Sequence, residues 1–164
     1  MGAGKTTVGA ALAARLGRTF LDSDRQVEAR TGQTVAEIFA ARGEPAFRAE
    51  ESAALADALA SPQAVVVAAA GGTVLDPANR AAIKSAGCVV WLRAAPAVLA
   101  QRVAPGDHRP LLASDPAGSL ARLDGVRRPL YAELADVTLD VEGCSVDALV
   151  DKIVKAVATE DPAC

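Results

Sequence analysis

An alternation of short apolar runs with helical patterns is the feature that most constrains how this chain of 164 residues can fold. Ala64–Ala69 is a continuous apolar run, typical of a strand buried on both faces. Thr19–Leu21, Cys88–Leu92 and Val137–Val141 predict three further strands. Because strands separated by helices of this length pair in parallel, the pattern predicts an α/β fold with one parallel sheet and helices on both faces.

The connecting segments have helical periodicity. Thr34-Val35-Ala36-Glu37 is a capping box that begins one helix, Gly43 ends it, and Pro45 lies in the first turn of the next. The predicted helices cover 5–16, 24–30, 34–43, 45–60, 77–86, 96–103, 118–131 and 146–157. No linker or second domain interrupts this order, so residues 1–164 predict a single domain.

Composition excludes several classes of protein. The net charge is −3 without a long basic run, so we expect no nucleic-acid partner. Charged residues or glycines interrupt every apolar stretch, so we expect no membrane partner. Cys88, Cys144 and Cys164 are scattered and odd in number, which indicates reduced thiols in a cytoplasmic protein.

Gly4-Lys5-Thr6 is the end of a Walker A motif, G-x-x-x-x-G-K-[ST]. Glycines let backbone N–H groups turn inward around phosphates, and the helix that follows adds its positive end. The Lys5 side chain can reach the β- and γ-phosphates, and the Thr6 hydroxyl can bind Mg²⁺. The alternative is a glycine-rich helix start without a ligand, but the α/β context favours a nucleotide site.

The Walker A motif is incomplete at its start, because its first glycine would lie two residues before Met1. The strand that should precede the loop is absent as well, and in folds of this kind that strand is central. We therefore expect further residues upstream. We also expect the chain starting at Met1 to be unstable or inactive, because a central strand pairs with neighbours on both sides.

Carboxylates follow the first predicted strand as Asp22-Ser23-Asp24, at the edge where open α/β sheets bind ligands. A carboxylate there can accept a proton from an attacking hydroxyl or hold water around Mg²⁺. The alternative is a helix N-cap formed by Ser23 or Asp24.

Two arginines on separate helices, Arg48 and Arg127, can hold a planar carboxylate by forked hydrogen bonds. Glu51 lies one helical turn after Arg48 and can orient its guanidinium. Surface salt bridges are the alternative for each arginine alone. Arg102 precedes an irregular segment, 104–116, and Arg109 lies within it; we expect this segment to form a lid over triphosphate.

Together these motifs resemble the shikimate kinase family over nearly the whole chain. The matching pieces are Gly-Ala-Gly-Lys-Thr-Thr, Leu21-Asp22-Ser23-Asp24, Ile38-Phe39 with Gly43-Glu44, Phe47-Arg48 with Glu50-Glu51, Gly71-Gly72, Arg109-Pro110-Leu111-Leu112 and Arg127-x-Pro129-Leu130-Tyr131. The resemblance implies a three-layer P-loop fold with a short lid over 104–116 and a substrate region over about 24–60. It implies transfer of the γ-phosphate of ATP to the 3-hydroxyl of shikimate, on the route to chorismate and aromatic amino acids, by a monomer.

The resemblance also implies roles for individual residues. Asp24 contacts shikimate and is the general base, and Lys5 and Arg109 complete the catalytic set. Shikimate is held by Asp24, Arg48, Gly71 and Arg127, with Phe39 and Phe47 along its ring. ATP is held by Gly2, Ala3, Gly4, Lys5, Thr6, Thr7, Arg102 and Arg109. Thr6 ligates Mg²⁺, with Asp22 behind it through water.

The chain departs from the family pattern at two positions. Ala70 replaces the first of three glycines, so its backbone must avoid positive φ or carry strain. Ala68 stands where a hydroxyl residue is often found, which could weaken the water shell of Mg²⁺ and reduce activity.

Two alternatives remain open at this point. One is a related kinase of a small metabolite, such as gluconate, although the paired Arg48 and Arg127 favour a ring carboxylate. The other is a non-catalytic nucleotide-binding fragment, which the absent strand and Ala68 motivate.

Overall fold

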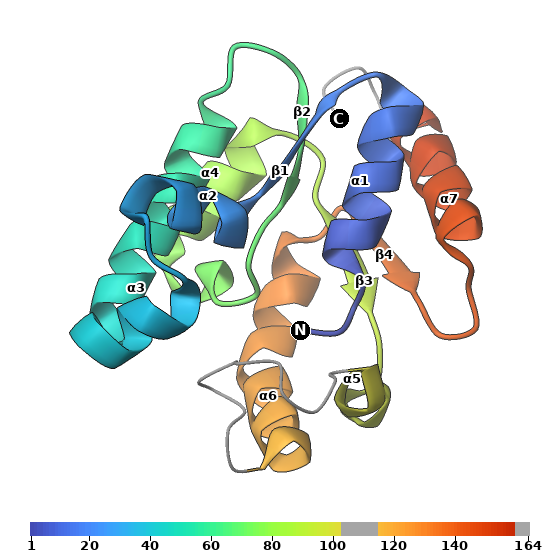
Figure 1. Cartoon of the computed structure of the whole chain (residues 1–164). Coiled ribbons are helices and arrows are strands. Elements are labelled where there is room, and N and C mark those ends of the chain that lie inside the picture. Colours follow the sequence, from blue (N-terminus) through green and yellow to red (C-terminus); the bar gives the residue numbers. More distant parts are fainter. Residues whose placement is uncertain (103–114, 160–164) are drawn as a thin grey trace.

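The computed structural model describes residues 1–102 and 115–159. Residues 104–114 of the predicted lid, which include Arg109, lie outside the described residues. The elements, in chain order, are α1 (Lys5–Leu16), β1 (Thr19–Asp22), α2 (Ser23–Thr31), α3 (Val35–Leu59), β2 (Val65–Ala68), the 3₁₀ turn η1 (Thr73–Leu75), α4 (Pro77–Ala86), β3 (Val90–Arg93), α5 (Pro96–Arg102), α6 (Pro116–Leu134), β4 (Val137–Asp140) and α7 (Val146–Thr159) (Figure 1).

The four described strands form two parallel pairs. β1 pairs with β2, with Thr19 opposite Val65, and β3 pairs with β4, with Val90 opposite Val137. Within the described ranges no ladder joins β2 to β3. The predicted parallel α/β architecture is confirmed, and the division into two pairs agrees with a sheet that lacks a central strand.

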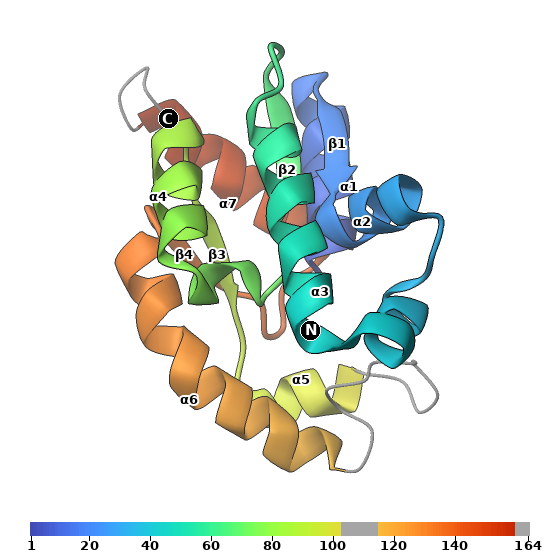
Figure 2. The same ribbon diagram turned by 90° about the vertical axis from the view of Figure 1, so that its left-hand side faces the viewer.

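Helices cover both faces of the strands. α1 packs against α7 and against β1 and β2, while α3 packs against α2 and α4 (Figures 1 and 2). The core between α1, α7 and the second strand pair contains Val8, Leu12, Val141, Leu149, Val150 and Ile153. A smaller core under α2 and α3 contains Val27, Ile38, Phe47 and Ala54. These layers place the carboxyl ends of β1 and β2 beside the beginning of α1.

β2 is less buried than its apolar sequence predicts. Val65, Val66 and Val67 are half-buried, and only Ala68 is fully buried. Side chains of a parallel strand are covered on both faces when the strand lies between two neighbours. β2 has one neighbour, β1, among the described strands, so its valines remain partly accessible.

Capping residues and glycines determine where the helices begin and end. Thr34 and Glu37 form the predicted capping box, and Gly43 breaks α3 with φ 78° and ψ 175°, a conformation that favours glycine. α6 begins earlier than predicted, because the Asp115 side chain accepts the Gly118 N–H at 2.9 Å. The 3₁₀ turn η1 was not predicted, since three residues carry no measurable periodicity.

Two other expectations from composition can be compared with the structure. Among the described residues, neither Cys88 nor Cys144 forms a disulfide, and Cys164 lies outside the described residues. Within 1–102 and 115–159, no helix is both long enough and apolar enough to cross a bilayer.

Ser23 ties the end of β1 to the end of β2, and its replacement provides a test of this arrangement. The Ser23 hydroxyl is 1% exposed and accepts the Ala70 N–H at 2.8 Å. In Ser23→Ala this partly buried N–H loses its acceptor, so we expect a loss of about 1–3 kcal/mol in the free energy of unfolding. Urea denaturation measures this loss. The control, Ser85→Ala on the exposed face of α4, should change stability by less than about 0.5 kcal/mol; equal effects would contradict the structural role of Ser23.

Candidate active site

The glycine-rich segment before α1 has the backbone geometry of a phosphate loop. Gly2 and Gly4 adopt left-handed φ values of 74° and 86°, which side-chain-bearing residues rarely adopt. No side chain caps α1 at Gly4, so the N–H groups of the first turn are directed toward the loop. A helix beginning of this kind binds anions through its N–H groups and its dipole. The residues expected at ATP therefore occupy the loop and this first turn: Gly2, Ala3, Gly4, Lys5, Thr6 and Thr7.

Asp22 connects this loop to the acceptor side of the site. Its Oδ2 accepts a hydrogen bond from the Thr6 hydroxyl at 2.7 Å, and its Oδ1 accepts the Asp24 N–H at 3.1 Å. Asp22 is therefore the N-cap of α2, and the alternative that Ser23 or Asp24 forms this cap is wrong. Asp24 occupies the first turn of α2 with an exposed side chain, two residues beyond the carboxylate that contacts Thr6.

Arg48 is held by two carboxylates on its own helix. Its guanidinium donates to Glu51 at 2.8 Å and to Glu44 at 2.9 Å. The predicted contact with Glu51 is confirmed, whereas the contribution of Glu44 was not predicted. Glu51 is 2% exposed, and this burial raises the pKa of its carboxyl, while the hydrogen bond from Arg48 opposes the shift. Arg48 thus neutralises a buried carboxylate and keeps a fixed orientation.

The small size of Gly71 and Gly72 leaves space for the guanidinium groups of Arg48 and Arg127. A side-chain carbon at Gly71 would lie 3.4 Å from the Arg127 guanidinium, and one at Gly72 would overlap the Arg48 guanidinium. Neither glycine has a positive φ, so their small size, rather than a special conformation, is what the site requires. The structure therefore confirms that Arg48, from α3, and Arg127, from α6, converge at the end of β2.

Arg127 is buried, so the alternative that it forms only a salt bridge on the surface is wrong. It is 6% exposed, and its Nε has no hydrogen-bond partner among the described residues. A buried donor of this kind is costly unless a ligand or water satisfies it. An anionic ligand between Arg127 and Arg48 would supply that acceptor.

Tyr131 supports this corner and was not assigned a role from the sequence. Its hydroxyl donates to the Gly71 carbonyl oxygen at 2.8 Å, and its ring lies 5.7 Å from that of Trp91. Burial raises the pKa of the Tyr131 hydroxyl. The spacing of Tyr131 could have indicated this role, because a residue four positions after Arg127 lies on the same face of α6.

The remaining predicted residues lie nearby. The Phe39 and Phe47 rings are 4.8 Å apart, but Phe47 is almost fully buried and belongs to the core under α2 and α3. Arg102, at the end of α5, is exposed, and its Cβ lies 3.6 Å from the position of a side-chain carbon at Gly2. No described residue other than glycine has a positive φ, so Ala70 carries no strain of that kind.

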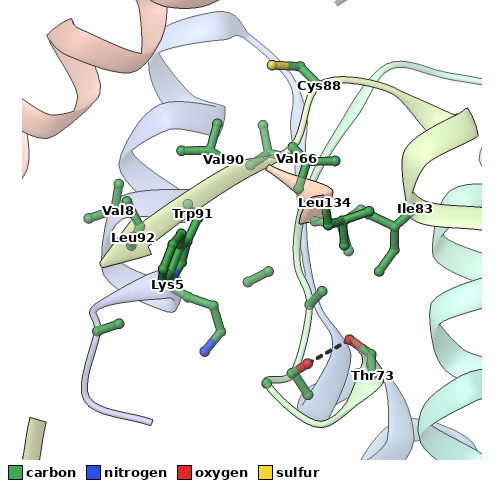
Figure 3. Close-up of a pocket in the computed structure, with 18 of the residues that line it drawn as sticks. Lys5, Val8, Val66, Thr73, Ile83, Cys88, Val90, Trp91, Leu92 and Leu134 are labelled. Carbon is green, nitrogen blue, oxygen red and sulfur yellow. Dashed lines mark hydrogen bonds between the residues drawn. The ribbon is translucent and has the colours of Figure 1, made fainter. Parts of the chain in front are cut away.

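The phosphate loop and the arginine corner open into a common space. Lys5, Gly71, Thr73 and Arg127 all line a cavity of about 650 Å³. Figure 3 shows the Lys5 ammonium directed into this cavity, on the side opposite Ile83. The arrangement can therefore bring a phosphate on the loop toward an anionic acceptor held by the arginines.

Comparison with known proteins agrees with this geometry. A family model described as "Shikimate kinase" matches residues 1–158. The chain belongs to the shikimate kinase family. Among the curated relatives of this kinase, the shikimate kinase of Burkholderia lata is 47% identical over 154 residues, or 93% of this chain and 83% of the relative. That of Symbiobacterium thermophilum is 47% identical over 158 residues, or 94% of this chain and 90% of the relative.

A solved structure of a shikimate kinase from Acinetobacter baumannii in complex with shikimate is also similar to this kinase. Its TM-score is 0.94 at 38% identity, with 99% of this chain and 90% of that chain covered. The shikimate kinase of Aquifex aeolicus has a TM-score of 0.83 at 29% identity, with 96% of this chain and 92% of that chain covered. The resemblance inferred from the motifs is thus confirmed at the level of family and fold.

The contact between Gly72 and Arg48 predicts a pH-dependent loss of stability in Gly72→Ala. The new methyl group displaces the Arg48 guanidinium, and Glu51 is left buried without its nearest cation. Its folded-state pKa then rises further above the unfolded value of 4.5, so stability falls as pH rises through that range and the full loss is present above it. With one pKa unit equal to about 1.4 kcal/mol, we expect a loss about 1–3 kcal/mol larger at pH 8 than at pH 5, measured by urea denaturation.

Gly125→Ala is the matched control for this experiment. Gly125 lies on the exposed side of α6, and a side-chain carbon there would meet nothing within 4 Å. Alanine is favoured over glycine within a helix by about 0.5–1 kcal/mol, so this variant should be slightly more stable at both pH values. A pH-independent effect of Gly72→Ala would show that Arg48 keeps its contact with Glu51.

Proposed function

We propose that this kinase transfers the γ-phosphate of ATP to the 3-hydroxyl of shikimate. The observation that carries the proposal is the convergence of Arg48 and Arg127 on Gly71 and Gly72, beside a phosphate loop that opens into the same cavity. Two guanidinium groups at one corner suit a carboxylate, which forked hydrogen bonds can hold in a fixed plane. Shikimate is also the ligand of the similar Acinetobacter enzyme.

ATP is the co-substrate of this family, and the loop supplies its phosphate site. The N–H groups around Gly2 and Gly4 and the first turn of α1 surround the phosphates, and Lys5 neutralises the charge near the γ-phosphate. Arg102 lies beside Gly2, a position from which it can cover the adenine. We propose that Arg109 approaches the transferring group, in the role that the family resemblance implies.

The donors beside the loop also fit Mg²⁺. The Thr6 hydroxyl and the Asp22 carboxylate are hard oxygen donors in direct contact at 2.7 Å. Within the described part of the chain, no group of three or more His, Cys, Asp and Glu side chains forms a metal cage. This suits Mg²⁺, which keeps several waters and binds through few protein ligands together with substrate phosphates. When bound, the ion neutralises charge on the phosphates; Thr6 would ligate it directly and Asp22 through water.

Asp24 is our candidate for the group that acts on the acceptor hydroxyl. It lies in the first turn of α2, directly after the carboxyl end of β1 and two residues from Asp22, which contacts Thr6. We propose that the Asp24 carboxylate accepts the proton of the 3-hydroxyl as the oxygen forms its bond to the γ-phosphorus. The bond from that phosphorus to the bridging oxygen of ATP breaks, and ADP leaves. Positioning and charge neutralisation supply most of the catalysis in such transfers.

The other functions considered have less support. Gluconate also carries a carboxylate, so the buried Arg127 beside Gly71 is compatible with either acceptor. A non-catalytic role would not require a carboxylate at Asp24. The comparisons favour shikimate kinase over both alternatives.

Asp24→Asn tests the proposed general base. The amide keeps the shape of the side chain but cannot accept the hydroxyl proton, so we expect kcat with shikimate to fall by about 10²- to 10⁴-fold. ATP binding, measured by calorimetry, should stay within about twofold. The control is Glu28→Gln, the same change on the exposed face of α2, which should leave kcat unchanged. A kcat of Asp24→Asn within a few-fold of the original would mean that Asp24 orients shikimate without accepting its proton.

Arg127→Ala tests carboxylate recognition. A charge-assisted hydrogen bond contributes about 1.5–3 kcal/mol, so KM for shikimate should rise roughly 10- to 100-fold while KM for ATP changes little. Arg122→Ala, an exposed arginine on the same helix, should change neither constant. Because Arg127 is buried, the melting temperature of each variant is measured as well. An effect on KM for ATP alone would place Arg127 in the nucleotide site.

A further inference from the structure

The acceptor side of the site is built from two segments that leave the sheet at different strands. Asp24 follows β1 in the first turn of α2, whereas Gly71 and Gly72, which form a glycine turn, follow β2 beside the two acceptor arginines. The last paired residues of the β1–β2 ladder are Asp22 and Ala68, so backbone pairing ends before either segment begins. A further interaction is needed to fix Asp24 relative to the glycine turn.

The Ser23 hydroxyl connects these two segments. It accepts the Ala70 N–H at 2.8 Å, across 47 positions in the chain. Ser23 is almost fully buried, so solvent has little access to this hydrogen bond. Its hydroxyl does not cap α2, because the Asp22 carboxylate accepts the Asp24 N–H in that role. A buried hydroxyl that accepts a distant amide instead of capping its own helix holds two parts of the chain together.

The residue that Ser23 holds is fixed on its other side as well. The Ala70 carbonyl oxygen accepts the Thr73 hydroxyl at 2.7 Å, a bond drawn in Figure 3, and the Thr73 N–H at 3.1 Å. The next carbonyl oxygen, that of Gly71, accepts the Tyr131 hydroxyl at 2.8 Å. Thr73 and Tyr131 hold the turn from its own segment and from α6. Ser23 holds it from α2, the helix that carries the proposed general base.

We propose that Ser23 is a positioning residue for phosphoryl transfer, whose hydroxyl sets the distance between the Asp24 carboxylate and the acceptor in the arginine corner. The inference rests on the proposed function, in which Asp24 accepts the proton of the 3-hydroxyl. Transfer requires close alignment of the reacting groups, and a displacement of about 1 Å can lower a rate roughly 10²-fold. Ser23 acts through the Ala70 amide and not on the substrate itself.

Ser23→Ala tests this role by kinetics. Without an acceptor for the Ala70 N–H, the glycine turn can shift relative to Asp24, so we expect kcat with shikimate to fall about 10- to 100-fold. The contact between the phosphate loop and Asp22 is unchanged, so KM for ATP should stay within about twofold. KM for shikimate should rise less than about threefold, because the ion pairs and hydrogen bonds of the arginine corner remain.

Two further variants separate positioning from loss of stability. Ser23→Thr keeps the hydroxyl and should restore kcat to within about threefold of that of the original chain. Val150→Ala removes two buried methyl groups from the core between α1 and α7, so it should lower the melting temperature and leave kcat unchanged. Rates are compared at a temperature at which melting curves show every variant folded. Should Ser23→Ala not fold there, Ser23→Cys, with a similar size and a weaker acceptor, should lower kcat at least about threefold.

Hydrogen exchange tests the bond itself. The Ala70 amide should exchange at least about tenfold faster in Ser23→Ala than in the original chain, and Ser23→Thr and Val150→Ala should leave its rate unchanged. A kcat of folded Ser23→Ala within about twofold of the original would overturn this inference alone, whatever the exchange rate. A folded Ser23→Thr as slow as Ser23→Ala, or an equal fall of kcat in Val150→Ala, would also overturn it. Failure of the original chain to phosphorylate shikimate would overturn the proposed function, and this inference with it.

Discussion

The contact between Thr6 and Asp22 is the interaction on which the site depends. It joins the beginning of α1, where a phosphate would bind, to the end of β1, where Asp22 caps α2 and Asp24 lies in the first turn of that helix. Both positions follow from the parallel direction of β1 and β2, since the carboxyl ends of parallel strands meet at one edge. The proposed nucleotide and acceptor sites are therefore joined by one hydrogen bond, between two residues that are 16 positions apart in the chain.

The acceptor corner depends on close packing around two glycines. Arg48 is neutralised by the buried Glu51, Arg127 lies against Gly71, and Tyr131 holds the Gly71 carbonyl. A buried charge is tolerated only when it is paired and hydrogen-bonded, and Arg127 retains one donor without a partner among the described residues. An acceptor of negative charge would satisfy that donor, which is the physical reason that this corner suits a carboxylate.

The strands differ from the predicted sheet in forming two separate pairs, with a cavity between β2 and β3. The valines of β2 were expected to be covered on both faces, yet they remain half-buried because the strand pairs on one edge. The same space lies beside Lys5, so the packing of the central layer and the anchoring of the phosphate loop are physically coupled.

Local signals in the sequence determined the helix beginnings, the break at Gly43, the parallel α/β class and the phosphate loop, because capping, periodicity and glycine conformation act over a few residues. The paired roles of Arg48 and Arg127 came from resemblance to a family, since no spacing within the chain brings 48 and 127 together. Only the tertiary structure decided that Arg127 is buried, that Gly71 and Gly72 are required for space, and that Tyr131 supports them. Those properties arise from contacts between α3, α6 and the end of β2, and such long-range packing has no periodic trace in the sequence.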